Sequence, residues 1–295
     1  MFHHFYGDNH IYGDGAISAG DLEMIISKIG RSNILSAQEW LFKWETNRLK
    51  NNEICLTFDD NLKSQYDIAY PVLKKHGITA FWYIYTSVYE GILEKIEIYR
   101  YFRITCFKKA NDFYNEFFEM AILFDEKLGE AIKGFPEDYY IQYTFYSRMD
   151  RLFRYIRDVV LSPEKYSNIM ELLQTKHNFI GSELRDKLWI TKDEIKHLHA
   201  EGNIIGLHSH THPTNISIFK FADQKKEYYT NYEYLTSIIS EKPKTVAYPC
   251  GSYNDDTLKI MKDLNIKLGF RKDHFKNELA SLEYPRFDHA YILNN

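Results

Sequence analysis

Short apolar runs and helical stripes alternate along both ends of this chain. In the first part, the runs at 53–58 and 78–85 have the length and composition of strands, and a helical stripe at 64–76 lies between them. A strand, a helix and a strand joined by short connections form a βαβ unit, which implies a parallel sheet. The alternation returns after residue 190, where we expect strands at 203–207, 245–248 and 267–270.

Two helices are expected ahead of the first of these strands. Ser18 and Ser36 each precede an apolar stripe with helical spacing, and serine is a preferred residue at a helix N-cap. These helices are expected at 18–29 and 36–49, and the aromatic-rich residues 1–5 are expected to form a short strand. Further helices are expected at 191–201, 223–240 and 255–264.

The middle of the chain has a different pattern. Between residues 91 and 189 the strand-like alternation disappears and helical periodicity dominates, so we expect a helical insertion between the parts 1–90 and 190–295. One helix of this region carries an arginine row, Arg148, Arg151, Arg154 and Arg157, opposite its apolar stripe. We expect a solvated, salt-bridged face; contact with a phosphate-bearing substrate or partner is the alternative, because guanidinium groups suit phosphate.

Composition limits the classes of function. A formal charge of -4 over 295 residues argues against a general nucleic-acid binder. Three cysteines, Cys55, Cys106 and Cys250, are too few and too irregularly spaced for a disulfide framework and favour a reducing compartment. The first residues lack the pattern of a signal peptide, and no apolar run approaches the roughly 18–20 residues of a transmembrane segment. We therefore expect a cytoplasmic protein.

The densest cluster of candidate chemistry is His208-Ser209-His210-Thr211-His212-Pro213. His208 and His212 stand four residues apart, so both imidazoles can turn toward one point and bind a divalent metal, with Zn²⁺ favoured by nitrogen and oxygen ligands. The apolar run 204–207 places this cluster at the end of a strand, where α/β enzymes carry their sites. A solvated histidine cluster after a strand is the alternative.

A second cluster, Asp59-Asp60, follows the strand at 53–58. Adjacent carboxylates repel each other unless they share a cation or a proton, although an aspartate that caps the next helix is an alternative explanation. One aspartate can bind zinc beside two histidines and leave a position open for water, and the other can accept that water's proton. Such a site is suited to hydrolyse an amide or an ester.

Three segments together resemble the polysaccharide deacetylases, the NodB-homology or carbohydrate esterase 4 family. They are Thr57-Phe58-Asp59-Asp60, His208-Ser209-His210-Thr211-His212-Pro213 and Tyr248-Pro249-Cys250-Gly251-Ser252-Tyr253. The resemblance implies an α/β fold, a distorted (β/α) barrel of the NodB-homology type, with 1–90 and 190–295 as its two parts and 91–189 as a helical insertion. It also implies a hydrolase that removes an N-acetyl group, less often an O-acetyl group, from a sugar.

The resemblance also implies roles for individual residues. Asp59 corresponds to the general base, and Asp60, His208 and His212 correspond to the ligands of one divalent metal, with Zn²⁺ favoured. His210 falls at a variable position and is left out of the ligand set. In the third segment, Tyr248 and Cys250 correspond to substrate and oxyanion contacts, and the Cys250 backbone N–H needs no particular side chain for this role.

The sequence departs from the family pattern at two points. The arginine that commonly orients the base is replaced by Ala247, and Arg286 is our candidate substitute. The usual C-terminal Leu-x-His segment that supplies the catalytic acid is not evident, and His274 and His289 lie outside such a context. Some family members look circularly permuted, with this histidine on the first strand. Phe2-His3 resembles that arrangement, so His3 is the expected acid.

A family member of this kind suggests surface-glycan biosynthesis, such as O-antigen or capsule. The expected partner is an acetylated sugar, either free or linked to a nucleotide or a lipid. We expect no nucleic-acid partner and no transmembrane segment. Two other functions stay open: a related amidohydrolase acting on a non-sugar amide, and a catalytically decayed barrel that binds carbohydrate.

Overall fold

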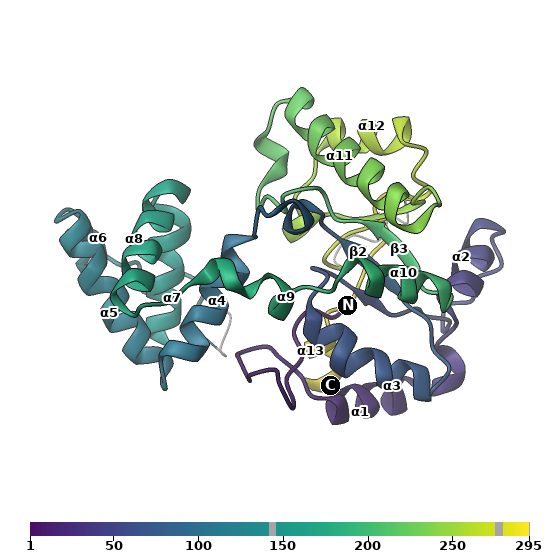
Figure 1. The fold of residues 1–295 in the computed structure, drawn as a ribbon, viewed down its shortest axis with the longest axis horizontal. Helices are drawn as coiled ribbons and strands as arrows, with labels where there is room; N and C mark the ends of the chain where they lie inside the picture. Colours follow the sequence, from purple (N-terminus) through teal and green to yellow (C-terminus); the bar gives the residue numbers. More distant parts are fainter. Residues whose placement is uncertain (142–145, 275–279, 295) are drawn as a thin grey trace. The chain divides into compact units, whose positions relative to one another are not determined.

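Five short parallel strands form one curled sheet within the unit made by Met1–Glu94 and Arg185–Asn295 (Figure 1). The computed structural model describes residues 1–141, 146–274 and 280–294. The sheet order follows the sequence: β1 (Thr57–Phe58), β2 (Phe81–Ile84), β3 (Ile204–Leu207), β4 (Thr245–Ala247) and β5 (Leu268–Phe270). All four pairings are parallel, so the carboxyl ends of the strands share one edge. The predicted parallel sheet is confirmed, with strands shorter than the apolar runs.

Helices connect successive strands. The segment 64–76 begins with a π-helical turn, η2 (Gln65–Ala69), and continues as α3 (Tyr70–Lys75). α10 (Lys192–Ala200) leads into β3, α11 (Phe221–Ile239) joins β3 to β4, and α12 (Asp255–Asp263) joins β4 to β5. α11 packs on α12, while α1 (Ala19–Ile29) contacts α3 and the C-terminal helix α13 (His289–Asn294) (Figure 1).

The expected caps are present at both early helices. Ser18 caps α1 (Ala19–Ile29), and Ser36 caps α2 (Ala37–Glu45) through the backbone N–H of Glu39. α2 was expected to reach residue 49 and ends at Glu45 instead. Asn47 has a left-handed φ of 52°, and the N–H groups of Asn47 and Arg48 bond back to the Trp44 carbonyl at 3.1 Å and the Lys43 carbonyl at 2.7 Å, which closes the helix there.

The sheet is apolar on both faces, as a parallel sheet covered by helices requires. Trp82 and Ile84 of β2 pack into a large core with the surrounding helices, whereas Phe81 and Tyr83 face a second cluster that includes Trp40 of α2. This second cluster fills the inside of the curled sheet. It is tight: a Cβ atom at Gly206 would lie 2.4 Å from the Tyr83 ring, so β3 needs glycine there.

The predicted strand at residues 1–5 was wrong. Phe2 forms a single parallel bridge with Phe58, because its N–H donates to Thr57 O at 2.9 Å and its carbonyl accepts from Asp59 N–H at 3.1 Å. The next ladder bond would use the Asp59 carbonyl, which instead accepts from the Gln65 side chain at 2.6 Å. The first residues therefore lie beside β1 for one bridge only.

Residues Lys95–Leu184 form a second compact unit, separate from the unit made by Met1–Glu94 and Arg185–Asn295. Its described residues contain helices and no strand, and its range lies within the helical insertion expected at 91–189. Its core is largely aromatic, with Phe113 and Phe117 against Phe153 at ring distances of 5.4 and 4.9 Å. Its helices are α4 (Lys95–Cys106), α5 (Ala110–Phe124), α6 (Leu128–Lys133), α7 (Arg148–Tyr155) with the π-helical turn η4 (Ile156–Val160), and α8 (Pro163–Lys176).

The arginine row of α7 and η4 uses partners within its own unit. Arg148 pairs with Glu137 at 2.8 Å, and Arg157 pairs with its neighbour Asp158 at 2.5 Å. Arg151 donates to the Tyr139 carbonyl at 3.2 Å, and Arg154 stacks over the Tyr146 ring. These contacts fit the expected salt-bridged face, and the alternative of a phosphate contact gains no support from them.

None of the helices in the described part of the chain has the length and apolar character needed to cross a membrane.

Candidate metal centre and catalytic site

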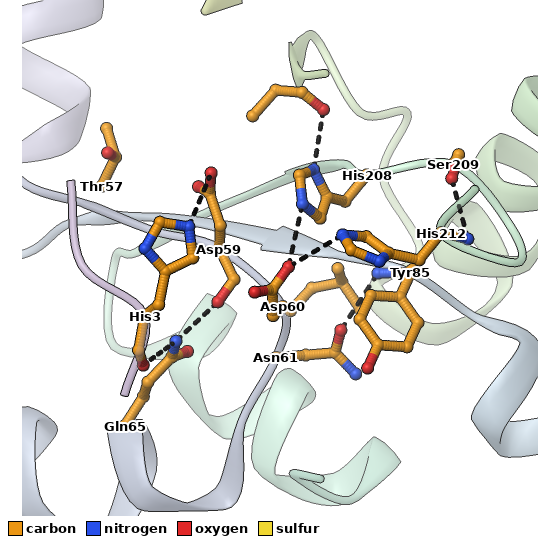
Figure 2. A network of polar contacts seen from close by, with 12 residues as sticks. His3, Thr57, Asp59, Asp60, Asn61, Gln65, Tyr85, His208, Ser209 and His212 are labelled. Carbon is orange, nitrogen blue, oxygen red and sulfur yellow. Dashed lines mark hydrogen bonds and ion pairs between the residues drawn. The ribbon is translucent and has the colours of Figure 1, made fainter. Parts of the chain in front are cut away.

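Three potential metal ligands meet at the carboxyl edge of the sheet. Asp60 follows β1, and His208 and His212 lie in the loop after β3. Asp60 Oδ1 is 3.1 Å from the Nε2 atoms of both histidines (Figure 2). One ligand atom from each residue lies within 4.8 Å of the others, so the three side chains converge on one point. One carboxylate oxygen and two imidazole nitrogens form a common ligand set for a catalytic divalent metal.

The backbone at these residues is unusual. Asp60 has a φ of 75° and Asn61 a φ of 43°, while Ser209 and His212 have φ values of 61° and 57°. Residues other than glycine adopt this left-handed region at a cost of roughly 1–2 kcal/mol each, so specific contacts must hold them there. The Asn61 side chain accepts from Tyr85 N–H at 3.1 Å, and the Ser209 hydroxyl accepts from His212 N–H at 3.1 Å.

The hydrogen bonds around the ligand set fit a bound cation. His208 Nδ1 donates to the Ala247 carbonyl at 2.8 Å, which leaves Nε2 as the ring nitrogen that faces Asp60. Burial raises the pKa of Asp60, but His212 and His208 outweigh burial and hold this pKa well below its ordinary value. A divalent metal between Asp60 Oδ1 and the two Nε2 atoms would replace these contacts, because a carboxylate oxygen and two imidazole nitrogens suit it as ligands.

Asp59 has a different partner from Asp60. Arg286 donates two hydrogen bonds of 2.7 Å each to its carboxylate, and Asp59 and Arg286 are only 3% and 5% exposed. The same guanidinium donates to the Arg271 carbonyl at 2.8 Å and to the Thr57 hydroxyl at 3.1 Å. Burial raises the pKa of Asp59, but Arg286 outweighs it and holds the pKa below its ordinary value. Asp59 is therefore an ionised carboxylate, held by the arginine that we had selected as its partner.

His3 lies beside Asp59, with 3.9 Å between its Nε2 and Asp59 Oδ2 (Figure 2). Burial lowers the pKa of His3, although the charges of Asp60 and Asp59 oppose this shift. The expected acid and the expected base therefore lie side by side, and both roles stay predictions. His289 packs against Phe2, and His274 stacks on Phe287.

Gln65 fixes this neighbourhood, and the sequence interpretation missed it. Its side-chain nitrogen donates to the carbonyls of His3 at 2.7 Å and Asp59 at 2.6 Å, and the residue is fully buried (Figure 2). This carboxamide ties the backbone that carries His3 to the backbone that carries Asp59. A polar residue on the buried face of the helix after the aspartate pair was the available signal.

The third segment forms the turn after β4. Cys250 is exposed there, with a left-handed φ of 53°. Tyr248, by contrast, is a core residue: it is 1% exposed, its hydroxyl donates to the Leu282 carbonyl at 2.8 Å, and its ring stacks on Tyr253. A substrate contact at Tyr248 would therefore have to use its backbone, because its ring lies in the core; the contact itself stays a prediction.

His210 points away from the ligand set. Its Nδ1 lies 2.9 Å from the Thr86 hydroxyl, and its carbonyl accepts from the N–H groups of Thr86 and Ser87. These contacts give His210 a structural role in the loop and agree with its exclusion from the metal ligands.

Comparison with the sequence profiles of known families finds a match to one family. The sequence profile of the family described as "Polysaccharide deacetylase" matches residues 163–269. The matched range includes His208, His212 and the turn around Cys250, whereas Asp59 and Asp60 lie outside it. Among curated proteins, no significant sequence match was found.

Solved structures with the same fold cover nearly the whole chain. The deacetylase PplD of Streptococcus pyogenes, in complex with acetate, has a TM-score of 0.56 at 17% identity, covering 99% of this chain and 94% of its own. A de-N-acetylase from Aggregatibacter actinomycetemcomitans has a TM-score of 0.54 at 13% identity, with coverage of 97% and 91%. IcaB from Ammonifex degensii has a TM-score of 0.53 at 13% identity, with coverage of 96% and 87%.

The resemblance to the polysaccharide deacetylases is confirmed. The predicted fold class is confirmed with it, since the five parallel strands and their helices match the (β/α) barrel of the deacetylases. The site described above lies where the deacetylase fold brings the carboxyl ends of its strands together.

The buried Asp59–Arg286 pair can be tested by its effect on stability. Arg286→Ala leaves a carboxylate buried without its counter-ion, so the free energy of unfolding should fall by roughly 3–5 kcal/mol. Urea unfolding of chelator-treated protein, followed by tryptophan fluorescence, would measure this loss. All four tryptophans lie in the unit that carries the site, so the signal is specific to it.

The double variant Asp59→Ala/Arg286→Ala is the control for this prediction. Because it removes both charges, its loss should be clearly smaller than the sum of the two single losses. Strict additivity would contradict a coupled ion pair.

Proposed function

We propose that this chain is a metal-dependent hydrolase that removes an N-acetyl group from a sugar, with Zn²⁺ as the metal. The observation that carries the proposal is the convergence of Asp60, His208 and His212 beside the ionised Asp59. A three-ligand site leaves a coordination position for water, and a nearby carboxylate provides a base. The family match and the fold support an acetylated carbohydrate as the class of substrate.

The chain would hold the metal through Asp60 Oδ1 and the Nε2 atoms of His208 and His212. When bound, the metal lowers the pKa of a coordinated water and polarises a carbonyl group. In the proposed reaction, Asp59 accepts a proton from the attacking water while Arg286 keeps its carboxylate in place. The backbone N–H of Cys250 is the proposed donor to the carbonyl oxygen, on which negative charge develops.

The leaving group needs a proton of its own. Water adds to the acetyl carbon, the C–N bond breaks, and the products are acetate and the sugar amine; an amine leaves readily only when it is protonated. We assign this proton to His3. Its position 3.9 Å from Asp59 suggests that the proton taken by Asp59 reaches the amine through His3, with one water sufficient to bridge the gap.

The natural substrate is proposed to be a sugar of surface-glycan biosynthesis, such as O-antigen or capsule, in nucleotide- or lipid-linked form. The decayed-barrel alternative is disfavoured because the candidate base and all three candidate ligands occupy one site with their partners in place.

Acetate release tests this function directly. We expect purified protein to release acetate from at least one member of a panel of N-acetylated nucleotide sugars, lipid-linked sugars and oligosaccharides. Chelation should abolish release, and added Zn²⁺ should restore it. Small non-sugar amides form the comparison panel. Release from that panel alone would favour the amidohydrolase alternative, and release that survives complete metal removal would contradict the proposed mechanism.

The metal assignment predicts a contrast between two histidines of one loop. His212→Ala should lose most of the bound metal, because an open site with two remaining ligands binds zinc weakly. His210→Ala should retain it, because that ring contacts Thr86. Elemental analysis of dialysed protein would measure both, and full occupancy in His212→Ala would remove this ligand.

The proton-transfer assignment predicts a second pair of variants. Asp59→Asn should bind metal but lose turnover, because an amide cannot accept the proton. His3→Ala should also keep metal and fold, and should lose at least about tenfold in kcat. His4→Ala is the matched control, and its loss in kcat should be smaller. Turnover close to wild type in either test variant, measured as acetate release, would exclude that residue from its role.

A further inference from the structure

The loop that carries two candidate ligands, residues 208–212, needs support from outside itself. Two of its five residues, Ser209 and His212, have left-handed φ values of 61° and 57°. With these angles the imidazoles of His208 and His212 both face Asp60. A short loop with this cost would relax in the absence of fixed hydrogen-bond partners.

Glu227 of α11 supplies three such bonds. Its Oε2 accepts from the N–H groups of His210 at 3.0 Å and Thr211 at 2.8 Å, and its Oε1 accepts from the Thr211 hydroxyl at 2.7 Å. Its carboxylate therefore binds the two residues that lie between Ser209 and His212. Hydrogen bonds to an ionised acceptor are among the stronger ones in proteins, and this carboxylate is partly buried.

Asn231 stands one helical turn after Glu227, on the same face of α11. Its Oδ1 accepts from His208 N–H at 3.1 Å, and its Nδ2 donates to the Ile84 carbonyl at 2.9 Å and to the Thr86 hydroxyl at 3.2 Å. The residue is fully buried. Asn231 thus joins the ends of β2 and β3 where the loop begins.

We propose that Glu227 and Asn231 are positioning residues for the metal centre. Together they hold the loop, before the metal binds, in the conformation that presents the two histidines. The free-energy cost of ordering the loop is then part of folding and does not weaken metal binding. Both side chains act on the candidate ligands through the loop backbone, at the N–H groups of His208, His210 and Thr211. The inference rests on the metal centre of the proposed function and adds the residues that set its affinity.

The test is the dissociation constant for Zn²⁺, measured by competition with a chelating dye on metal-free protein. Glu227→Ala should weaken binding by about 10–100-fold, the usual effect of removing a group that orients metal ligands. Glu227→Gln keeps one acceptor oxygen and should fall between Glu227→Ala and wild type. Asn231→Ala should weaken binding as well.

Asp223→Ala is the matched control, because it removes the same charge one helical turn earlier in α11 and leaves the three loop bonds intact. It should bind Zn²⁺ as wild type does, which separates hydrogen bonding from simple loss of negative charge. Co²⁺ absorption provides a second readout: the d–d bands should change in Glu227→Ala and stay unchanged in Asp223→Ala. Thermal melting of the metal-free variants, followed by tryptophan fluorescence, would show that binding is measured on folded protein.

The inference is overturned if folded Glu227→Ala and Glu227→Gln bind Zn²⁺ as tightly as wild type, or if Asp223→Ala weakens binding equally. A wild-type protein that binds no divalent metal would overturn the metal centre of the proposed function and this inference with it. Zn²⁺ binding by the wild-type protein therefore separates failure of this inference from failure of the proposed function.

Discussion

Two neighbouring carboxylates are buried at the end of β1, and the site depends on their having different partners. Asp59 is neutralised by the guanidinium of Arg286, whereas Asp60 turns through a left-handed backbone toward two imidazoles. Burying either charge alone would cost several kcal/mol. This separation suits each carboxylate to the one role proposed for it: Arg286 holds Asp59 by two hydrogen bonds, and the two candidate histidine ligands face Asp60.

The two partners come from distant parts of the chain. Arg286 is 227 residues from Asp59 in sequence, and His208 is 148 residues from Asp60. The parallel sheet brings them together because every strand ends at the same edge. Polar side chains behind that edge then fix the backbone: Gln65 links the segments of His3 and Asp59. Glu227 and Asn231 link α11 to the histidine loop. The site is thus organised by buried hydrogen bonds as much as by its candidate ligands.

The sequence predicted the features that have local signals. Apolar runs ending at Asp59 and His208 indicated strands, and Ser18 and Thr191 indicated helix starts, because each signal lies within a few residues of its effect. The choice of Arg286 followed from the missing arginine at Ala247, and the structure places Arg286 against Asp59. The catalytic and ligand roles themselves stay predictions.

The features that the sequence did not predict have a common physical origin in tertiary contacts. The run 1–5 resembles a strand, but the Gln65 side chain donates to the Asp59 carbonyl, which the next hydrogen bond of a longer strand pairing would use. Tyr248 lies in a segment that resembles a family motif, yet its ring is drawn into the core by Leu282 and Tyr253. Glu227 and Asn231 look like ordinary polar residues of an amphipathic helix, and nothing local distinguishes them from residues facing solvent. Polar groups that bond to distant backbone leave little trace in one sequence.

The most direct measurement is anomalous X-ray diffraction at the zinc absorption edge from crystals of the metal-loaded protein. The account predicts one strong peak at about 2 Å from Asp60 Oδ1 and from the Nε2 atoms of His208 and His212. Asp59 should lie outside the ligand shell and keep its two bonds to Arg286. A peak coordinated by Asp59, or the absence of a peak at the three ligands in fully loaded protein, would contradict the division of roles between the two carboxylates.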